Sequence, residues 1–405
     1  MRALRSVVAA LLIVGACVPA ASRPETRATP PVAGITPSGV EIASAADLLR
    51  GDLAFVQRGV SEAQGFGHTE IWAVPLDGRP PRRVLRYPRL WTYETFVSRQ
   101  LSADGRAFAF HAERGDGLQR IVIADLAGGT MRWLATDERE VHDVQPVWSP
   151  DGRAMAFARV QGRLGAARQA GVWVVGVDGS GIAELAAGRD APTHLYGWTP
   201  DGSRIAFAQN TGYDLVDVRS RDVASMPNLV SGVISWRRGT PAYVAAGWND
   251  SNDALIVAGD GPGLARREMV RAPRGEYLTS PRWRTGADEF MYLWSRPVSG
   301  SPHPEREIRR ASADGRALGA VPTTRAFTSA EWSPDGTGVV YREQHYAPTP
   351  GGPGPAGPMP PGERTAGASL RLVRIDGTAD REIFQLRQGV EAAELAWDFA
   401  VRRYT

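Results

Sequence analysis

The 405-residue sequence contains a single cysteine, Cys17, and no lysine. One cysteine cannot form a disulfide within the chain, so the fold has to be held by apolar burial and backbone hydrogen bonds. All 47 basic residues are arginines, and they occur as scattered pairs that are not interleaved with aromatic residues. Because the net charge is also only +3, we expect no nucleic-acid partner.

Long apolar runs are missing as well. The run from Val7 to Val14 follows Arg2 and Arg5 and precedes small residues, which is the pattern of a secretory signal peptide. It is far shorter than the roughly 20 apolar residues that a membrane-spanning helix needs. The sequence therefore predicts a secreted chain with no spanning helix in this region.

The run ends in Val14-Gly15-Ala16-Cys17, which resembles the lipobox of bacterial lipoproteins. In that family the chain is cut before the cysteine and the cysteine is acylated. The resemblance implies lipidation of Cys17 and a protein anchored to a membrane outside the cytoplasm, in the periplasm or at the cell surface. The alternative is a chance cysteine in an ordinary signal peptide.

One stretch, QPVWSPDGRAMAFA from Gln145 to Ala158, recurs along the chain. Such a repeat sets the architecture before any single residue is considered. The other copies are LSADGRAFAFHA from Leu101, WTPDGSRIAFAQ from Trp198, WSPDGTGVVYRE from Trp332 and the degenerate WRTGADEFMYLW from Trp283.

Each copy has the chemistry of a β-hairpin. Pro, Asp and Gly favour a tight turn, and apolar residues alternate with a period of two beyond it, as in Ala154 to Ala158. A second β-rich segment ending in Asp-Gly follows, such as VWVVGVDG from Val172 to Gly179, and then a fourth apolar stretch. The unit is therefore a four-stranded antiparallel sheet of roughly 45 to 50 residues, the size of one propeller blade.

Counting these units predicts an all-β, seven-bladed β-propeller. The first blade begins with the stretch Gly51 to Val56 and lacks an inner strand of its own, and the segment Glu394 to Asp398 resembles an inner strand without the rest of its blade. Pairing this segment, which contains Trp397, with the strand that contains Phe55 would close the ring and remove two exposed edges. Six blades are the alternative, because the unit from Trp236 to Pro273 is short and degenerate. The seven inner-strand anchors are Leu101, Trp148, Trp198, Trp236, Trp283, Trp332 and Trp397.

The W-S-P-D-G pattern, followed by a later D-G, resembles the WD-like repeat of the TolB-like propellers of bacterial periplasms. That family includes binding partners of peptidoglycan-associated lipoproteins, propeller domains of prolyl-oligopeptidase-like peptidases and oligogalacturonate-lyase-like enzymes. The chain departs from TolB in its lipobox and in having no room for a separate amino-terminal α/β domain. The expected organisation is a signal peptide at 1–16, a disordered lipid-anchored tether at 17–45 and a propeller at 46–405.

The two faces of the predicted ring differ. One carries the short turns, and the other carries long connections, on which binding residues usually lie. The long connections are Arg58 to Thr69, Val160 to Ala170, Ser295 to Glu307 and the Pro/Gly-rich Glu343 to Ser369. Polar and aromatic candidates for ligand binding at the channel mouth are Tyr93, Glu94, His142, Asp143, His194, Tyr196, Glu276 and Tyr277.

We expect no catalytic residue, metal or cofactor. The sequence has no G-x-S-x-G nucleophile elbow, and its six histidines lack local ligand spacing. The aspartates of the repeated turns are expected to be structural. The favoured function is binding of a protein or an envelope macromolecule through the long-connection face. The alternative is a carbohydrate-active or other small-substrate enzyme with its site at the channel mouth.

Overall fold

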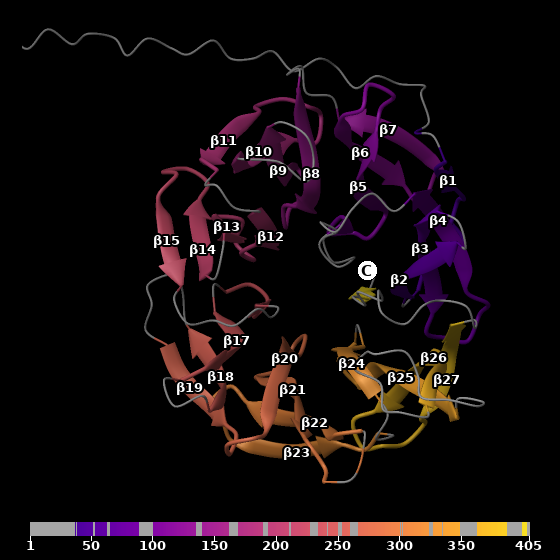
Figure 1. Ribbon diagram of the computed structural model, residues 1–405, viewed down its shortest axis with the longest axis vertical. Helices are drawn as coiled ribbons and strands as arrows, with labels where there is room; N and C mark the ends of the chain where they lie inside the picture. Colours follow the sequence, from indigo (N-terminus) through magenta and orange to yellow (C-terminus); the bar gives the residue numbers. More distant parts are fainter. Residues whose placement is uncertain are drawn as a thin grey trace, which may run out of the picture.

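The computed structural model contains seven antiparallel sheets arranged in a ring (Figure 1). It describes residues 37 and 39–402, with gaps at 52, 63–64, 89–99, 135–139, 162–168, 189–192, 210–211, 227–233, 241, 250–252, 260–265, 300, 302, 324–326, 334, 349–362 and 387–398. Within these residues, no helix is long and apolar enough to cross a membrane. The seven-bladed β-propeller predicted from the repeats is confirmed.

The first three blades follow one another in chain order. Blade 1 contains β1 (Glu41–Ile42), β2 (Leu53–Glu62), β3 (Gly65–Pro75), β4 (Arg82–Pro88) and β28 (Phe399–Arg402). Blade 2 contains β5 (Ala107–Glu113), β6 (Gln119–Asp125) and β7 (Thr130–Leu134), and Leu101 forms an isolated bridge to Phe108 on its inner side. Blade 3 contains β8 (Val141–Trp148), β9 (Ala154–Gln161), β10 (Gln169–Gly176) and β11 (Ala183–Ala186).

The other four blades are four-stranded. Blade 4 contains β12 (Thr193–Trp198), β13 (Arg204–Gln209), β14 (Gly212–Asp217) and β15 (Val223–Met226). Blade 5 contains β16 (Ser235–Trp236), β17 (Tyr243–Trp248), β18 (Ala254–Gly259) and β19 (Arg266–Arg271). Blade 6 contains β20 (Tyr277–Trp283), β21 (Glu289–Arg296), β22 (Glu305–Ser312) and β23 (Ala317–Val321). Blade 7 contains β24 (Phe327–Trp332), β25 (Gly338–Pro348), β26 (Glu363–Arg374) and β27 (Arg381–Leu386).

The two ends of the chain meet in blade 1, as predicted. The last strand, β28, pairs with β2 so that Phe55 lies opposite Ala400 and Leu53 lies opposite Arg402. The closing strand is thus Phe399–Arg402, a few residues beyond the expected segment 394–398, which lies outside the described residues together with Trp397. Closure leaves the inner edge of β2 paired and not exposed.

The structure of blade 5 distinguishes the seven-bladed prediction from the six-bladed alternative. Its inner strand β16 has only two residues, but β17, β18 and β19 form a complete meander that pairs from Tyr243↔Gly259 to Leu255↔Arg271. The shortened inner strand explains why this unit looks degenerate in the sequence. The six-bladed alternative is therefore excluded.

The packed body begins before the expected boundary at residue 46. Strand β1 adds a fifth strand to blade 1, and the Ala45 N–H donates to the Leu126 carbonyl of blade 2 at 2.8 Å. Ala45, Leu48 and Leu49 are buried in the apolar core of these two blades. Residues 40–49 therefore bind the outer rim of blades 1 and 2 together.

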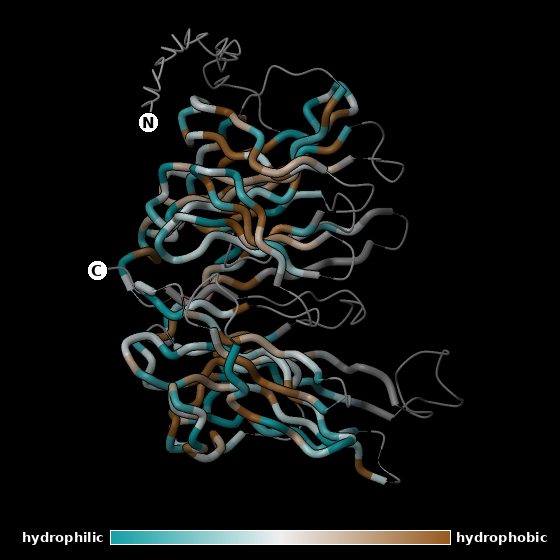
Figure 2. The backbone as a smooth tube through the Cα atoms, turned by 90° about the vertical axis from the view of Figure 1, so that its left-hand side faces the viewer, coloured by the Kyte–Doolittle hydropathy of each residue, from teal (hydrophilic) through white to brown (hydrophobic). Residues whose placement is uncertain are grey.

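Apolar side chains fill the spaces between neighbouring blades. One such cluster joins Val147 and Ala156 of blade 3 to Leu195, Ile205 and Phe207 of blade 4. In the side view, hydrophobic segments are concentrated within the disc (Figure 2). The core is thus a series of interfaces, and no blade buries its apolar residues alone.

Three of the repeated tryptophans connect their inner strand to the preceding one. The indole Nε1 of Trp148 donates to the Gln100 carbonyl at 2.8 Å, and that of Trp198 to the Val147 carbonyl at 3.2 Å. Trp332 Nε1 donates in the same way to the Arg282 carbonyl at 3.0 Å. The repeat therefore contributes both apolar area and one directional hydrogen bond between blades.

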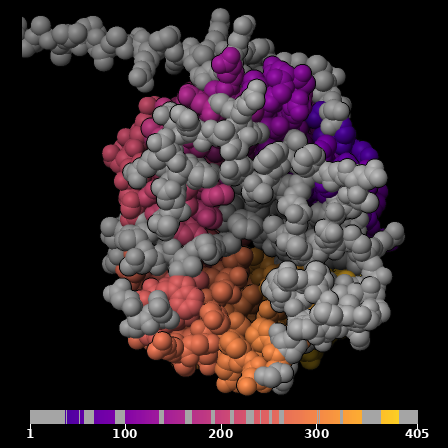
Figure 3. Space-filling view, in the orientation of Figure 1, coloured from indigo at the N-terminus to yellow at the C-terminus, as the bar shows by residue number. Residues whose placement is uncertain are grey.

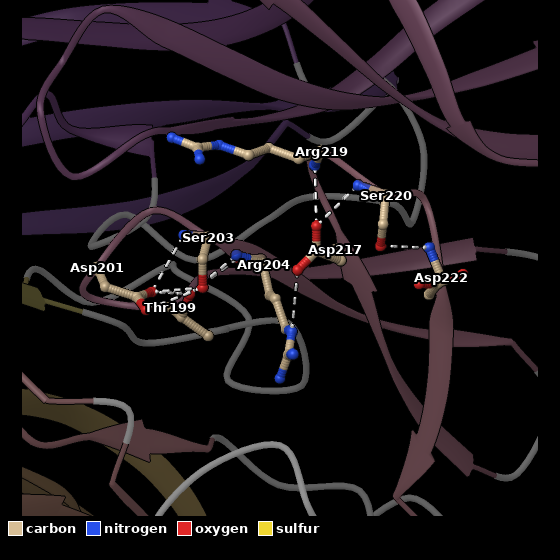
Figure 4. A network of polar contacts seen from close by, with 8 residues as sticks. All are labelled: Thr199, Asp201, Ser203, Arg204, Asp217, Arg219, Ser220 and Asp222. Carbon is tan, nitrogen blue, oxygen red and sulfur yellow. Dashed lines mark hydrogen bonds and ion pairs between the residues drawn. The ribbon is translucent and has the colours of Figure 1, made fainter.

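The repeated turns are held by Ser or Thr and Asp side chains, as Figure 4 shows for blade 4. The Thr199 hydroxyl donates to Asp201 Oδ1 at 2.6 Å, and the Ser203 N–H donates to the same oxygen at 3.0 Å. The Arg204 N–H then donates to Thr199 Oγ1 at 3.0 Å. The same pattern occurs at Asp104, Asp151 and Asp335, so the expected structural role of the turn aspartates is confirmed.

We predict that Trp332→Phe destabilises the protein more than Trp283→Phe by about 1 kcal/mol, because only Trp332 loses a hydrogen bond. Both rings have an arginine guanidinium above them, at 5.5 Å for Trp332 and 5.6 Å for Trp283. Trp283 Nε1, however, is buried without a hydrogen-bond partner. Urea unfolding of the two variants measures the difference, and equal losses would contradict a role for the indole N–H.

The turn network also predicts acid sensitivity. Burial acts to raise the pKa of Asp201, but hydrogen bonds from Thr199 and Ser203 outweigh it and lower the pKa below the ordinary value of 3.8. A lowered folded-state pKa contributes stability that is complete above the unfolded-state pKa and is lost as the pH falls through the folded one. Asp201→Asn keeps an acceptor oxygen but does not titrate. We expect the unfolding free energy of this variant to fall less than that of the wild type between about pH 6 and pH 3. Urea titrations at each pH measure both free energies, and equal decreases for the two proteins would refute this.

Candidate functional site: the long-connection face

The face that carries the long connections is defined by the strand ends that meet there. In every four-stranded blade the inner strand begins on this face, and the second and third strands are joined there. These ends lie to the right in Figure 2 and face the viewer in Figures 1 and 3. In Figure 3 the described residues follow one another around the ring in chain order. We call this surface the long-connection face.

Two of the expected long loops are largely strand. β2 and β3 stay paired as far as Glu62↔Gly65, and β25 and β26 stay paired as far as Pro348↔Glu363. The loop expected from Glu343 to Ser369 is thus reduced to residues 349–362, which lie outside the described part of the chain. The correction has a physical reason: backbone pairing continues past the end of the apolar alternation, where side-chain patterning no longer indicates a strand.

In blade 3, the predicted residues His142 and Asp143 are buried in β8. Asp143 accepts two hydrogen bonds from Arg159 of β9, from Nε at 2.7 Å and from Nη2 at 3.2 Å. The Arg159 guanidinium also lies 4.5 Å from the centre of the Trp173 ring. This bidentate, stacked geometry locks the second and third strands against the inner strand.

The same junction continues into blade 2. His142 Nδ1 accepts a hydrogen bond from the Gln119 N–H at 3.1 Å, so Nδ1 carries no proton in this arrangement. Arg120 donates to the Val141 carbonyl from the neighbouring blade. Burial lowers the pKa of Arg120, while the negative charge of Asp143 opposes this effect. His142 and Asp143 thus belong to a buried polar junction between blades 2 and 3.

In blade 4, His194 and Tyr196 lie on the inner strand β12. His194 is exposed, although desolvation of its ring lowers the pKa of the imidazole. Tyr196 packs on Tyr213 with ring centres 4.5 Å apart. Between them, the Leu195 N–H donates to Gln145 Oε1 of blade 3 at 3.0 Å, which links the two inner strands. This pair therefore lies at the face, on the inner strand next to that of blade 3.

In blade 6, Glu276 precedes β20 and Tyr277 begins it. The indole Nε1 of Trp294 donates to Glu276 Oε2. Tyr277 makes an edge contact with Trp248 of blade 5, with ring centres 5.9 Å apart and planes at 80°. Tyr277 is 44% exposed, whereas Trp294 is buried. Here the face presents an aromatic ring and a carboxylate whose positions are both fixed by neighbours.

The six described members of the predicted ligand set are distributed over blades 3, 4 and 6. Tyr93 and Glu94 lie outside the described residues, as does the predicted lipidation site Cys17. Across the described part of the chain, no three His, Cys, Asp or Glu side chains are grouped closely enough to hold a metal ion.

Sequence reasoning missed Arg159, Trp248 and Trp294. Arg159 could not be found from the turn alone: a β-bulge between Val144 and Val147 shifts the hairpin register by one residue and so brings Asp143 opposite Arg159. The contact between Trp248 and Tyr277 joins two blades, and neither hairpin's local pattern indicates it. The hydrogen bond from Trp294 to Glu276 lies within blade 6, but a second bulge between Thr279 and Arg282 separates it from the turn. Contacts that depend on a bulge or on a neighbouring blade were thus not accessible from local patterns.

Comparison with known proteins agrees with the fold. No protein-family model and no curated protein sequence matches the chain. Among solved structures, the β-propeller domain of the trilobed protease from Pyrococcus furiosus is 12% identical, with 89% of this chain and 100% of that chain covered and a TM-score of 0.51. A prolyl endopeptidase is 11% identical over 84% of this chain and 50% of its own, with a TM-score of 0.54. TolB from Acinetobacter baumannii is 15% identical over 89% and 67%, with a TM-score of 0.42.

The fold and the comparisons together define the class: the chain is a closed seven-bladed β-propeller. It spans half the length of the prolyl endopeptidase that it resembles. At these identities the likeness concerns the fold alone, so function has to be argued from this chain's own face.

We predict that Asp143→Asn lowers the unfolding free energy by about 3–5 kcal/mol, because it leaves the Arg159 guanidinium buried without its counter-charge. The matched control is Glu268→Gln. Glu268 pairs with Arg271 at 2.7 Å, but both side chains are more than a third exposed, so its loss should cost less than about 1 kcal/mol. Chemical denaturation of both variants measures the contrast, and similar small losses would contradict a structural role for the buried pair.

Proposed function

We propose that the protein is a lipid-anchored, extracytoplasmic propeller that binds a protein or an envelope macromolecule through its long-connection face. One observation carries the proposal: His194 and Tyr277 are exposed on this face, and the blades that hold them pack tightly against their neighbours. The opposite face is closed by tight turns whose polar side chains bond to their own backbone. A rigid ring that exposes binding side chains on one face suits recognition of a large partner.

The proposed anchoring follows from the lipobox-like Val14 to Cys17. Acylation of Cys17 would tie the amino terminus to a membrane, and residues 17–39 would link the anchor to the body. The linker would reach the ring where residues 40–49 pack on the outer rim of blades 1 and 2.

The alternative, a small-substrate enzyme at the channel mouth, calls for carboxylates or histidines that converge on one substrate. Among the described residues, Asp143 instead pairs with Arg159, and Glu276 accepts from the indole of Trp294. These carboxylates lie in different blades and stabilise local structure. The observations therefore favour binding over catalysis.

The test is capture of partners from native membranes by the full chain, compared with a deletion variant in which an Asn-Gly turn replaces residues 349–362. The two-residue turn closes the β25–β26 hairpin and leaves the strands that end at Pro348 and begin at Glu363. We expect the wild type to retain a macromolecular partner and the deletion to retain at least about threefold less, as for loss of a few interface residues.

A Cys17→Ser chain supplies the anchoring control. The proposal requires this variant to leave the membrane fraction while it still captures the partner. If the wild type captures no macromolecule, or if Cys17→Ser stays membrane-bound to the same extent, the corresponding half of the proposal is wrong.

A further inference from the structure

Tyr277 is distinctive on the long-connection face. Among the described residues, three large hydrophobic side chains are exposed, and Tyr277 is the aromatic one, the others being Val223 and Val298. It stands at the start of β20, the inner strand of blade 6, and therefore at the channel side of the face. An exposed aromatic ring at such a position is a natural point of contact for a ligand.

Neighbouring groups hold the Tyr277 ring in place. Its edge-on contact with Trp248 spans the junction between blades 5 and 6, and Trp248 itself packs against the apolar core of that junction. An edge-to-face pair leaves ring surface free that a stacked pair would cover. The ring is thus presented in a fixed orientation and needs little ordering when a ligand binds.

Three charged side chains lie around the indole of Trp294. One is Arg309, whose guanidinium lies 4.0 Å from the ring centre and donates to Glu307 at 2.6 Å. Glu276 accepts the indole N–H on one carboxylate oxygen, which leaves the lone pairs of the other oxygen to accept from a ligand. The Arg296 guanidinium lies 5.5 Å from the centre of the same indole and is oriented by Glu305 at 2.6 Å. The region therefore offers a fixed acceptor, fixed donors and no strong excess of either charge.

This combination restricts the ligand chemistry. A pyranose ring has a flat face of C–H groups that can lie on an aromatic ring, and it has hydroxyls at its edge that both donate and accept. A purely apolar segment would desolvate Glu276 without replacing its hydrogen bonds to water. Glu276 precedes Tyr277 in the chain, and Arg296 follows Ser295, the strand partner of Tyr277. Polar groups of both charges thus extend from backbone positions next to the exposed ring, which matches an uncharged sugar.

We propose that Tyr277, with Trp248, Glu276 and Arg296 around it, forms a subsite for a pyranose unit of an uncharged polysaccharide. The inference rests on the proposed function, and it identifies the partner of the long-connection face as an envelope polysaccharide and not a protein. Tyr277 supplies the stacking surface, Glu276 accepts from a sugar hydroxyl and Arg296 donates to another. The subsite binds and does not cleave.

The experiment uses the full chain in a detergent without a sugar headgroup. The probes are cellohexaose, maltohexaose and chitohexaose, with sorbitol as a polyol that has no pyranose ring. Saturation-transfer NMR reports contact with the sugar C–H protons, and titration of tryptophan fluorescence reports affinity. We expect at least one hexasaccharide to bind and sorbitol to give no signal.

Single substitutions test which residues bind the sugar. Tyr277→Ala should weaken it about tenfold or more, Tyr277→Phe should stay within about threefold because the ring remains, and Glu276→Gln should weaken it measurably. The matched control is Val223→Ala, an exposed residue directly after the β14–β15 turn on the opposite face, which should change nothing.

The proposal is overturned if none of the three hexasaccharides binds, or if Tyr277→Ala binds them as well as the wild type does. Capture of partners from membranes shows whether only the sugar subsite is wrong or whether the proposed binding function is wrong as well. If no sugar binds and Tyr277→Ala still captures a protein partner, the sugar subsite is rejected, while the proposal that this face binds a macromolecule stands. Hexasaccharide binding that depends on Tyr277 supports the subsite whatever the capture experiment retains.

Discussion

The structure depends on the contact between successive inner strands. Each blade leaves one apolar face for the next to cover, and the repeated tryptophan adds a hydrogen bond from its indole to the preceding inner strand, as from Trp198 to Val147. No blade can be stable alone, because its core is shared with its neighbours. The ring must therefore close, and the pairing of β28 with β2 closes it without a disulfide.

Closure explains why the two faces differ. The Ser-Asp turns, such as that at Ser149 and Asp151, are fully bonded to their own backbone and have little left to offer a partner. The opposite ends of the strands lie outside this turn network, and their side chains differ from blade to blade. There the chain places the extended β25–β26 hairpin, the exposed Tyr277 and the buried Asp143–Arg159 pair that stiffens the blade beneath.

Much of the fold could be predicted because its determinants are local. Turn chemistry and alternation repeat in each blade, so the sequence predicts blade size, blade number and closure by the chain ends. The strand β1 could not be predicted, because its stability comes from Val84 and Leu126, which are distant in sequence. For the face, the sequence identified Glu276 and Tyr277 but not Trp248, which contacts Tyr277 only when blades 5 and 6 pack together. It also missed Trp294, whose hydrogen bond to Glu276 within blade 6 lies beyond a β-bulge that shifts the hairpin register.

Hydrogen–deuterium exchange of the native full chain, resolved by mass spectrometry, tests the central claim of a closed ring most directly. The account predicts that the amides of Leu53–Val56 and Phe399–Arg402 are protected to a similar extent, because the two segments pair with each other. It also predicts that truncation after residue 398 increases exchange in Leu53–Val56. Rapid exchange of Phe399–Arg402 in the intact chain, or unchanged protection of Leu53–Val56 after truncation, would contradict ring closure.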